Sequence, residues 1–143
     1  MAQESLDVAR IGAEAAEVEP VAGRLPRNHR YAGGEFPHEQ LSPKYRAQGL
    51  KIKSNGYPDF EPYALQLPNG KKMVKINLTG SRRADEALAN KAAGLVERPE
   101  GFTWHHVEDE GTMMLVPTPL HQTVGHTAGA AKFVDRTGVP YRD

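Results

Sequence analysis

The fold of this protein is decided by residues 101–127, which read GFTWHHVEDEGTMMLVPTPLHQTVGHT. The first six residues are a glycine followed by aromatic, β-branched and histidine side chains, and they predict a strand over 101–106. Residues 108–111, EDEG, are typical of a tight turn, and residues 112–116, TMMLV, predict a second strand. Two strands joined by so short a turn are expected to pair as an antiparallel hairpin.

A helix is expected directly after this hairpin. Thr118 is a natural N-cap and Pro119 suits the first position of a helix, so we predict a helix from residue 120 to about residue 132. A helix that follows a hairpin without a linker packs across it. The segment 101–133 is therefore expected to fold as a hairpin–helix (ββα) unit.

Four of the six histidines of the chain lie inside this unit, namely His105, His106, His121 and His126. Neutral imidazole binds borderline divalent metal ions, and an imidazole near its unperturbed pKa accepts a proton from water at neutral pH. The chain has no cysteine, which leaves histidine and carboxylate as its good metal ligands. A site shared by the two strand histidines and the two helix histidines is the interpretation that we favour.

The spacing of these histidines sets two geometric conditions. Consecutive strand residues point to opposite faces, so His105 and His106 address one phosphate only if the strand bends or ends there. His121 and His126 are five residues apart, about 140° around a regular helix, so either the first turn is distorted or one of them is not a direct ligand. His126 is the preferred ligand of the two, and His121 could instead hydrogen-bond a neighbouring carbonyl.

Two further elements are predicted upstream of the unit. Asn69-Gly70 is a strong tight-turn signal, followed by alternating apolar and polar residues, and predicts a hairpin over 63–78. Ser81 is a natural N-cap for a helix over residues 82–95, which is expected to end near Gly94. Glycine and proline are frequent elsewhere, so we expect a loop-rich single domain of the α+β class around a ββα core.

The chain length is that of one domain. Residues 1–23 are interpreted as an N-terminal lead-in or linker, with a helical pattern at 3–18 that ends near Pro20, and residues 24–143 as the domain itself. The acidic N-terminus has no continuous apolar stretch, so we expect no signal peptide in this chain. No apolar run approaches the length of a membrane helix.

The formal net charge of the chain is zero, which by itself argues against an enzyme of nucleic acids. The distribution is uneven, because residues 24–53 and 71–98 are basic while residues 100–110 are acidic. Basic segments on both sides of an acidic, histidine-bearing segment suit a metal site next to a phosphate groove. Ordinary alternation of charge on a solvated surface is an equal alternative.

The histidines sit within a longer pattern, which is made up of Thr103–His106, Met114–Pro117, Leu120–His121 and Val124–Thr127. This pattern resembles the WHH family of the HNH (ββα-metal, His-Me finger) nuclease superfamily. Residues 55–60 and 78–90 are similar to the region that precedes the motif in that family, so the resemblance covers roughly residues 24–133. One departure follows the last histidine, where Gly-Gly is often found and this chain has Ala128-Gly129.

The resemblance implies an activity and a set of roles. WHH domains are typically C-terminal toxin domains of bacterial polymorphic toxins that degrade DNA in competitor cells, while a cognate immunity protein protects the producer. The resemblance implies a metal-dependent endonuclease in which His105, His121 and His126 hold one divalent ion and His106 is the general base. Ligation by histidines alone favours Zn²⁺ or Ni²⁺, and Mg²⁺ or Mn²⁺ is compatible because the substrate adds oxygen ligands.

The expected partners are DNA as the substrate and a cognate immunity protein, with no small-molecule ligand. The basic residues expected to make sequence-neutral contacts to phosphates are Lys71, Lys72, Lys75, Arg82 and Arg83. Each of them could instead be an ordinary solvated side chain. The domain is expected to be secreted or delivered as a toxin and to act in the cytoplasm of the target cell.

Two other functions fit the same residues. Four histidines could form a closed structural zinc site, which would make the unit a non-catalytic module that binds DNA or a protein. The unit could also be an RNase toxin, since nothing in the sequence shows how a 2′-hydroxyl is handled. Metal-dependent folding without turnover would mark the first alternative, and an RNA substrate would mark the second.

Overall fold

The computed structural model describes residues 18–125 and 128–143. Its helices and strands are η1 His29–Tyr31, η2 His38–Gln40, α2 Pro43–Arg46, η3 Glu61–Tyr63, β1 Val74–Lys75, α3 Arg82–Ala93, β2 Phe102–His106, β3 Thr112–Pro117, α4 Thr118–Thr123 and α5 Gly129–Thr137. Helices combined with one small antiparallel sheet confirm the α+β class. No helix in these described ranges is long and apolar enough to cross a membrane.

The chain divides into two compact units, one that ends at Asp59 and one that runs from Phe60 to Asp143. The helix predicted at 3–18 falls, except for Val18, outside the described residues. The rest of the first unit has only short helical turns and isolated bridges, as its proline and glycine content predicted. The predicted boundary between a lead-in and the domain at residue 23 stays a prediction.

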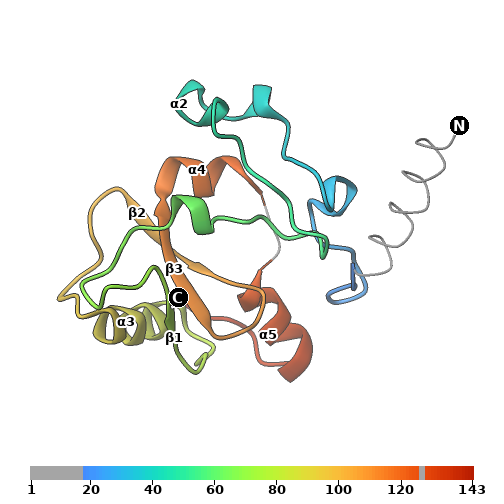
Figure 1. Cartoon of the computed structure of the whole chain (residues 1–143). Coiled ribbons are helices and arrows are strands. Elements are labelled where there is room, and N and C mark those ends of the chain that lie inside the picture. The colour runs from blue at the N-terminus through green and yellow to red at the C-terminus, as the bar shows by residue number, and fades with distance from the viewer. Residues whose placement is uncertain (1–17, 126–127) are drawn as a thin grey trace, which may run out of the picture. The chain divides into compact units, whose positions relative to one another are not determined.

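The second unit is built around an antiparallel sheet with the strand order β1-β3-β2 (Figure 1). β2 and β3 pair along their whole length, from Phe102 opposite Pro117 to His106 opposite Met113, which confirms the predicted hairpin. The carboxylate of Asp109 accepts hydrogen bonds from the backbone N–H groups of Gly111 and Thr112 at 3.1 and 2.8 Å and so holds the turn. β3 is the central strand, and its apolar residues form the middle of the core.

The hairpin predicted over 63–78 is wrong, although its turn is present. The side chain of Asn69 accepts a hydrogen bond from the backbone of Lys71 at 2.8 Å, as a turn asparagine does. The segments on either side of this turn pair with β3, because Leu65 N–H donates to the Leu115 carbonyl and Val74 lies opposite Met113. A second partner for an apolar central strand stabilises the fold more than a short isolated hairpin would, because two strands alone are only marginally stable in water.

α3 begins and ends where its sequence signals predicted. The Ser81 hydroxyl accepts a hydrogen bond from the backbone of Ala84 at 3.2 Å, and Gly94 ends the helix in the left-handed conformation with φ of 80°. Two fully buried alanines of α3 pack into the core with Trp104. The indole N–H of Trp104 donates to the Asn90 side chain at 2.8 Å, which ties α3 to the strand that carries two of the histidines.

The single helix predicted from residue 120 to 132 is wrong, because the structure has two helices in its place. α4 ends at Thr123, and Val124 leaves the helix with φ of −91° and ψ of 95°, fully buried. Glycine at 125 disfavours continuation of a helix, and an extended Val124 buries its side chain instead. Thr118 is the first residue of α4 and not its N-cap, and its hydroxyl bonds to that of Thr103 at 2.7 Å.

Candidate active site

The second unit contains a pocket of about 380 Å³ around the end of β2. Its lining comes from α3, β2, α4 and α5 and consists of Arg82, Glu86, Thr103, Trp104, His105, His106, His121, Ala128, Ala130 and Ala131. The structure therefore brings three of the four predicted site histidines to one pocket. His126, the fourth, lies outside the described residues.

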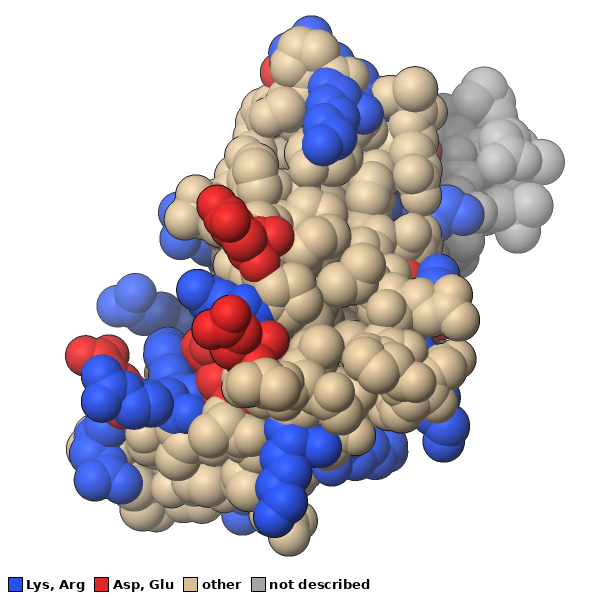
Figure 2. All heavy atoms as spheres, turned by 90° about the vertical axis from the view of Figure 1, so that its left-hand side faces the viewer, with Lys and Arg blue, Asp and Glu red and all other residues tan. Residues whose placement is uncertain are grey.

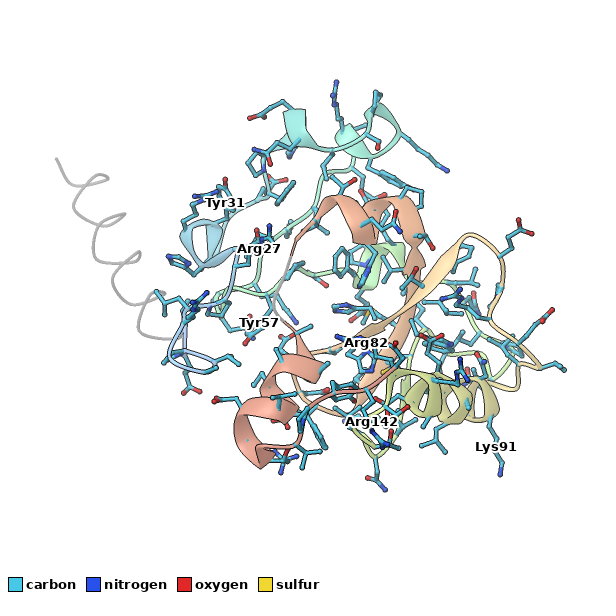
Figure 3. All side chains as sticks on the ribbon, turned by 180° about the vertical axis from the view of Figure 1, so that it is seen from behind. Arg27, Tyr31, Tyr57, Arg82, Lys91 and Arg142 are labelled. Carbon is cyan, nitrogen blue, oxygen red and sulfur yellow. The ribbon has the colours of Figure 1, made fainter. Side chains whose placement is uncertain are left out.

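A second hollow adjoins this pocket along α3. It is lined by Arg82, Arg83, Glu86, Ala87, Asn90, Arg98 and Asp143, and it shares Arg82 and Glu86 with the histidine pocket. In the view of Figure 2, Lys and Arg side chains gather with acidic ones among them on the surface that α3 forms. Figure 3 labels Arg82 at the beginning of α3, Lys91 near its end and Arg142 on the segment beside it.

Only two of the five predicted phosphate-binding residues lie in these hollows. Arg82 and Arg83 do, and both are exposed. Lys71, Lys72 and Lys75 are also exposed, but they stand on the turn before β1 and on β1 itself and line neither hollow. Arg98, which the sequence did not single out, completes the basic lining and pairs with Glu86 at 3.7 Å.

His105 and His121 meet in the buried part of the pocket. Nδ1 of His105 lies 3.2 Å from Nε2 of His121, and His105 is only 3% exposed. Phe60 packs against both rings, with centroid distances of 4.8 and 5.6 Å. The apolar ring of Phe60 thus helps to hold two imidazoles from β2 and α4 with nitrogen atoms facing each other.

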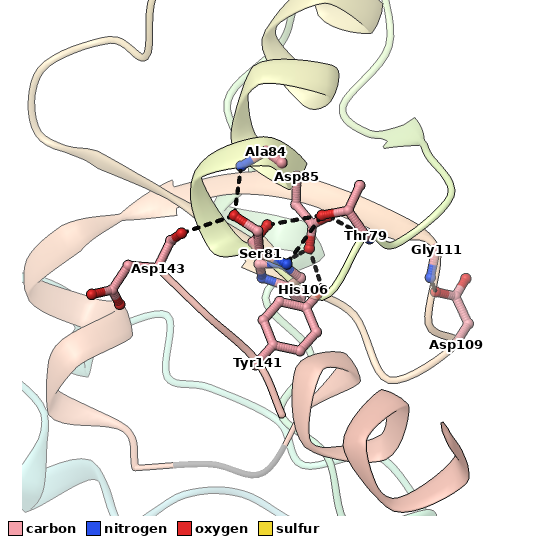
Figure 4. Close-up of polar contacts among 9 residues, drawn as sticks. All are labelled: Thr79, Ser81, Ala84, Asp85, His106, Asp109, Gly111, Tyr141 and Asp143. Atoms are coloured by element: carbon pink, nitrogen blue, oxygen red, sulfur yellow. Dashed lines mark hydrogen bonds and ion pairs between the residues drawn. The ribbon is translucent and has the colours of Figure 1, made fainter. Parts of the chain in front are cut away.

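His106 lies on the other side of β2 and contacts α3 (Figure 4). Its Nε2 is 3.0 Å from Oδ2 of Asp85, a carboxylate with no solvent exposure. The strand therefore keeps the ordinary alternation of side chains, and the pocket borders both histidines because it lies around the strand end.

The carboxylate of Asp85 is held ionised by its surroundings. Oδ1 accepts hydrogen bonds from the backbone N–H and the hydroxyl of Thr79 at 2.8 and 2.7 Å, and Oδ2 accepts them from His106 and the Tyr141 hydroxyl. Burial alone raises the pKa of Asp85, but the hydrogen bonds from Tyr141, Thr79 and His106 outweigh it and set this pKa below its ordinary value.

The protonation state of His106 follows from this partner. Burial lowers the pKa of His106 and Arg82 lowers it further, while the hydrogen bond and charge of Asp85 raise it, and the net direction is downward. His106 is therefore neutral at pH 7. An ionised carboxylate only accepts, so the single ring proton sits on Nε2 and leaves Nδ1 as the basic nitrogen.

Tyr141 is the other partner that reasoning from the sequence did not assign. Its ring stands edge-on to His106, with centroids 5.8 Å apart, and the guanidinium of Arg82 lies 5.4 Å from the centre of its ring. Burial and the hydrogen bond to Asp85 raise its pKa, so the phenol stays protonated and donates to the carboxylate. An isolated tyrosine in a polar segment carries no sequence signal for this role, and Asp85 reads as one of several charged residues of a helix.

Comparison with known proteins finds a family model that matches the histidine-bearing part of this site. Residues 96–135 match a family model described as a nuclease of the HNH/ENDO VII superfamily with conserved WHH. The likeness to the WHH nucleases is therefore one of this segment of the chain. The match contains the β2–β3 hairpin, α4 and most of α5, and its conserved Trp-His-His corresponds to Trp104, His105 and His106. No curated protein matches the chain.

Nucleases of the HNH/ENDO VII superfamily generally use a divalent metal ion. In a tetrahedral site with metal–nitrogen bonds of 2.0–2.1 Å, two ligand nitrogens stand about 3.3 Å apart. The 3.2 Å between His105 and His121 suits such a pair. Within residues 18–125 and 128–143 no three histidine, aspartate or glutamate side chains group around a common point. His105 and His121 are thus a pair whose nitrogen separation fits two ligands of one metal ion.

The objection raised by the spacing of His121 and His126 no longer holds. It assumed one regular helix through both positions, whereas α4 ends at Thr123. The 140° rotation therefore does not apply, and His121 is placed against His105 from the last turn of its own short helix.

The first turn of α5 forms one wall of the pocket and depends on a glycine. A Cβ on Gly129 would overlap the carbonyl oxygen of Val107, and it would lie 3.5 Å from Cβ of His106. Val107, which follows β2, and Gly129, the first residue of α5, thus lie so close together that no side chain fits between them. Glycine is therefore required at position 129 for a steric reason.

We expect Gly129→Ala to lower the free energy of unfolding by about 1–3 kcal/mol, because the added methyl group forces α5 away from Val107. Helix propensity alone predicts the opposite sign, a gain of about 0.5–1 kcal/mol. Urea unfolding followed by the fluorescence of Trp104, the only tryptophan, measures the change. An unchanged or raised stability would contradict the close approach.

Proposed function

We propose that this WHH nuclease is a metal-dependent DNase in which His106 is the general base. The observation that supports the proposal most strongly is the hydrogen bond of His106, whose Nε2 lies 3.0 Å from the buried carboxylate of Asp85. A base held in this way keeps its other ring nitrogen in one orientation, and His106 is one of the residues that line the pocket. The paired imidazoles of His105 and His121 border the same pocket.

The proposed roles of the residues are as follows. Nδ1 of His106 takes a proton from a water molecule, and the resulting hydroxide attacks phosphorus in line with the leaving 3′-oxygen. His105 and His121, with His126 as the predicted third ligand, would hold one divalent ion. Such an ion would supply positive charge that stabilises the transition state.

DNA is proposed as the substrate because a basic hollow extends from the pocket. Arg82, Arg83 and Arg98 line it together with the acidic Glu86 and Asp143. Arginine side chains bind phosphate oxygens in two-pronged geometry without reading the bases. We therefore infer that the strand leaving the scissile phosphate runs along α3.

Cleavage of plasmid DNA tests the proposed activity. We expect nicking by the purified chain with at least one of Mg²⁺, Mn²⁺, Ni²⁺ and Zn²⁺, and loss of nicking in EDTA. His106→Ala is expected to lower cleavage by about 10²–10⁴-fold, since it removes the base, while metal affinity measured by calorimetry is unchanged.

His38→Gln is the matched control, because His38 lies in the first unit and its Nε2 pairs with the exposed Glu35 at 2.8 Å. Equal loss of metal by His106→Ala would contradict the division of roles. A folded, metal-binding chain that cleaves no DNA would favour an RNA substrate or a structural metal module.

Salt dependence of DNA binding tests the basic hollow. In EDTA, Arg83→Gln is expected to weaken binding about equally on unrelated sequences and to reduce the slope of log affinity against log salt by about 1. Lys91→Gln, on the same helix but outside both hollows, is the matched control. The same measurement on Lys71, Lys72 and Lys75 tests the sequence-based prediction for them. An unchanged slope in Arg83→Gln would contradict the proposed strand path.

We further propose that the nuclease is the toxin domain of a bacterial polymorphic toxin that acts in the cytoplasm of a target cell and is neutralised by an immunity protein. The support is the likeness of its Trp104-to-His126 pattern to such domains. Expression of the chain in the cytoplasm of a bacterial host is expected to fragment DNA and stop growth, and the His106→Ala chain is expected to be tolerated. Equal growth with both chains would contradict the toxin role.

A further inference from the structure

We propose that the segment Tyr141–Asp143 is a strap that positions the general base. Tyr141 holds Asp85, and Asp85 holds His106 in the tautomer whose Nδ1 is free. The inference rests on the proposed role of His106, and it adds two positioning residues that touch neither substrate nor metal. The strap comes from the chain after α5, beyond the end of the family match at residue 135.

The strap is fixed by backbone contacts with the residues that lead into α3. The N–H of Arg142 donates to the Gly80 carbonyl, and the N–H of Arg82 donates to the Arg142 carbonyl, both at 2.7 Å. The hydroxyl of Ser81 donates to the backbone carbonyl of Asp143 at 2.8 Å (Figure 4). Three hydrogen bonds to Arg142 and Asp143 set the strap in register, and they do not depend on the identity of the Tyr141 side chain.

The side chain of Tyr141 is aimed by packing as well as by the backbone. Its ring stands edge-on to Phe133 of α5, with centroids 5.4 Å apart and planes at 82°, and edge-on to His106 at 88°. Arg82 covers the ring at 5.4 Å. With the ring held on three sides, the hydroxyl has one position, on Oδ2 of Asp85.

The orientation of the Asp85 carboxylate is fixed by a backbone N–H group, which can only donate a hydrogen bond. The backbone N–H of Thr79 donates to Oδ1 at 2.8 Å, and a backbone N–H never accepts. Oδ2 is therefore the oxygen that faces both Tyr141 and His106. Two donors on one oxygen fix the direction of the carboxylate, and the carboxylate in turn fixes the ring of His106 and the position of its proton.

Asp85→Asn tests this chain of contacts sharply, because it changes one oxygen to an NH₂ group with little change in volume. Thr79 keeps the amide oxygen on its side, so the NH₂ group faces Nε2 of His106. Nε2 must then accept, and the ring proton moves to Nδ1, where it blocks the base. We expect kcat for plasmid nicking to fall by about 10³–10⁴-fold with KM unchanged.

Tyr141→Phe tests the strap itself and removes only the hydroxyl. We expect kcat to fall by about 10-fold with KM unchanged, because Asp85 keeps its other hydrogen bonds but loses one of the two that aim Oδ2. Tyr31→Phe is the matched control, since Tyr31 belongs to the first unit and lines neither hollow of the second unit. Circular dichroism and urea unfolding of each variant establish that it is folded at the assay temperature.

Nitrogen-15 NMR of labelled histidines in EDTA gives a readout that does not depend on activity. We expect the Nε2–H tautomer of His106 in the wild-type chain and in Tyr141→Phe, and the Nδ1–H tautomer in Asp85→Asn. An Nε2–H tautomer in folded Asp85→Asn would overturn the positioning role of Asp85, and a kcat of Tyr141→Phe equal to that of Tyr31→Phe would overturn the strap.

The two proposals fail in different ways. If the wild-type chain cleaves no nucleic acid with any metal, the proposed function fails, while the tautomer measurement still decides whether Asp85 sets the proton of His106. If Asp85→Asn does not fold, Tyr141→Phe and the wild-type tautomer carry the test, and a wild-type Nδ1–H tautomer would contradict the proposal outright.

Discussion

The arrangement of the second unit depends on one buried carboxylate. Asp85 is fully removed from solvent, and an ionised group there is tolerated only when hydrogen bonds replace its hydration. Its four donors come from Thr79 before α3, from His106 at the end of β2 and from Tyr141 after α5. Satisfying one charge therefore requires three distant parts of the chain to meet at a single point, and that point is the wall of the histidine pocket.

The sequence predicted those elements whose signals are local. The β2–β3 hairpin has its turn and both strands within sixteen residues, and α3 has a serine at its beginning and a glycine at its end. The prediction of a hairpin over 63–78 was wrong although its turn is present. The strand after the turn pairs with the edge of β3 and not with the segment before the turn. A turn is determined by neighbouring residues and can be predicted from them. The partner of a strand depends on which apolar strand edge is available in the folded chain.

The site was predictable in its chemistry and only partly in its geometry. The residue types and spacing identified the histidines of the hairpin and of α4, and the structure brings His105 and His121 together. Asp85 and Tyr141 were not predicted as partners of His106, because they stand 56 residues apart in sequence and each looks ordinary in its own segment. The contact that orients His106 is therefore a property of the tertiary structure and carries no local pattern.

Adjacent positions on a strand explain how one short motif supports two kinds of histidine. Because β2 does not bend, His105 and His106 enter different surroundings, His105 among Phe60 and His121, and His106 beside a carboxylate. A carboxylate on the same side as the imidazole pair would compete as a ligand for any divalent ion held there. The alternation of side chains along the strand therefore places the two histidines of the Trp-His-His motif in different surroundings, with Asp85 bonded to His106.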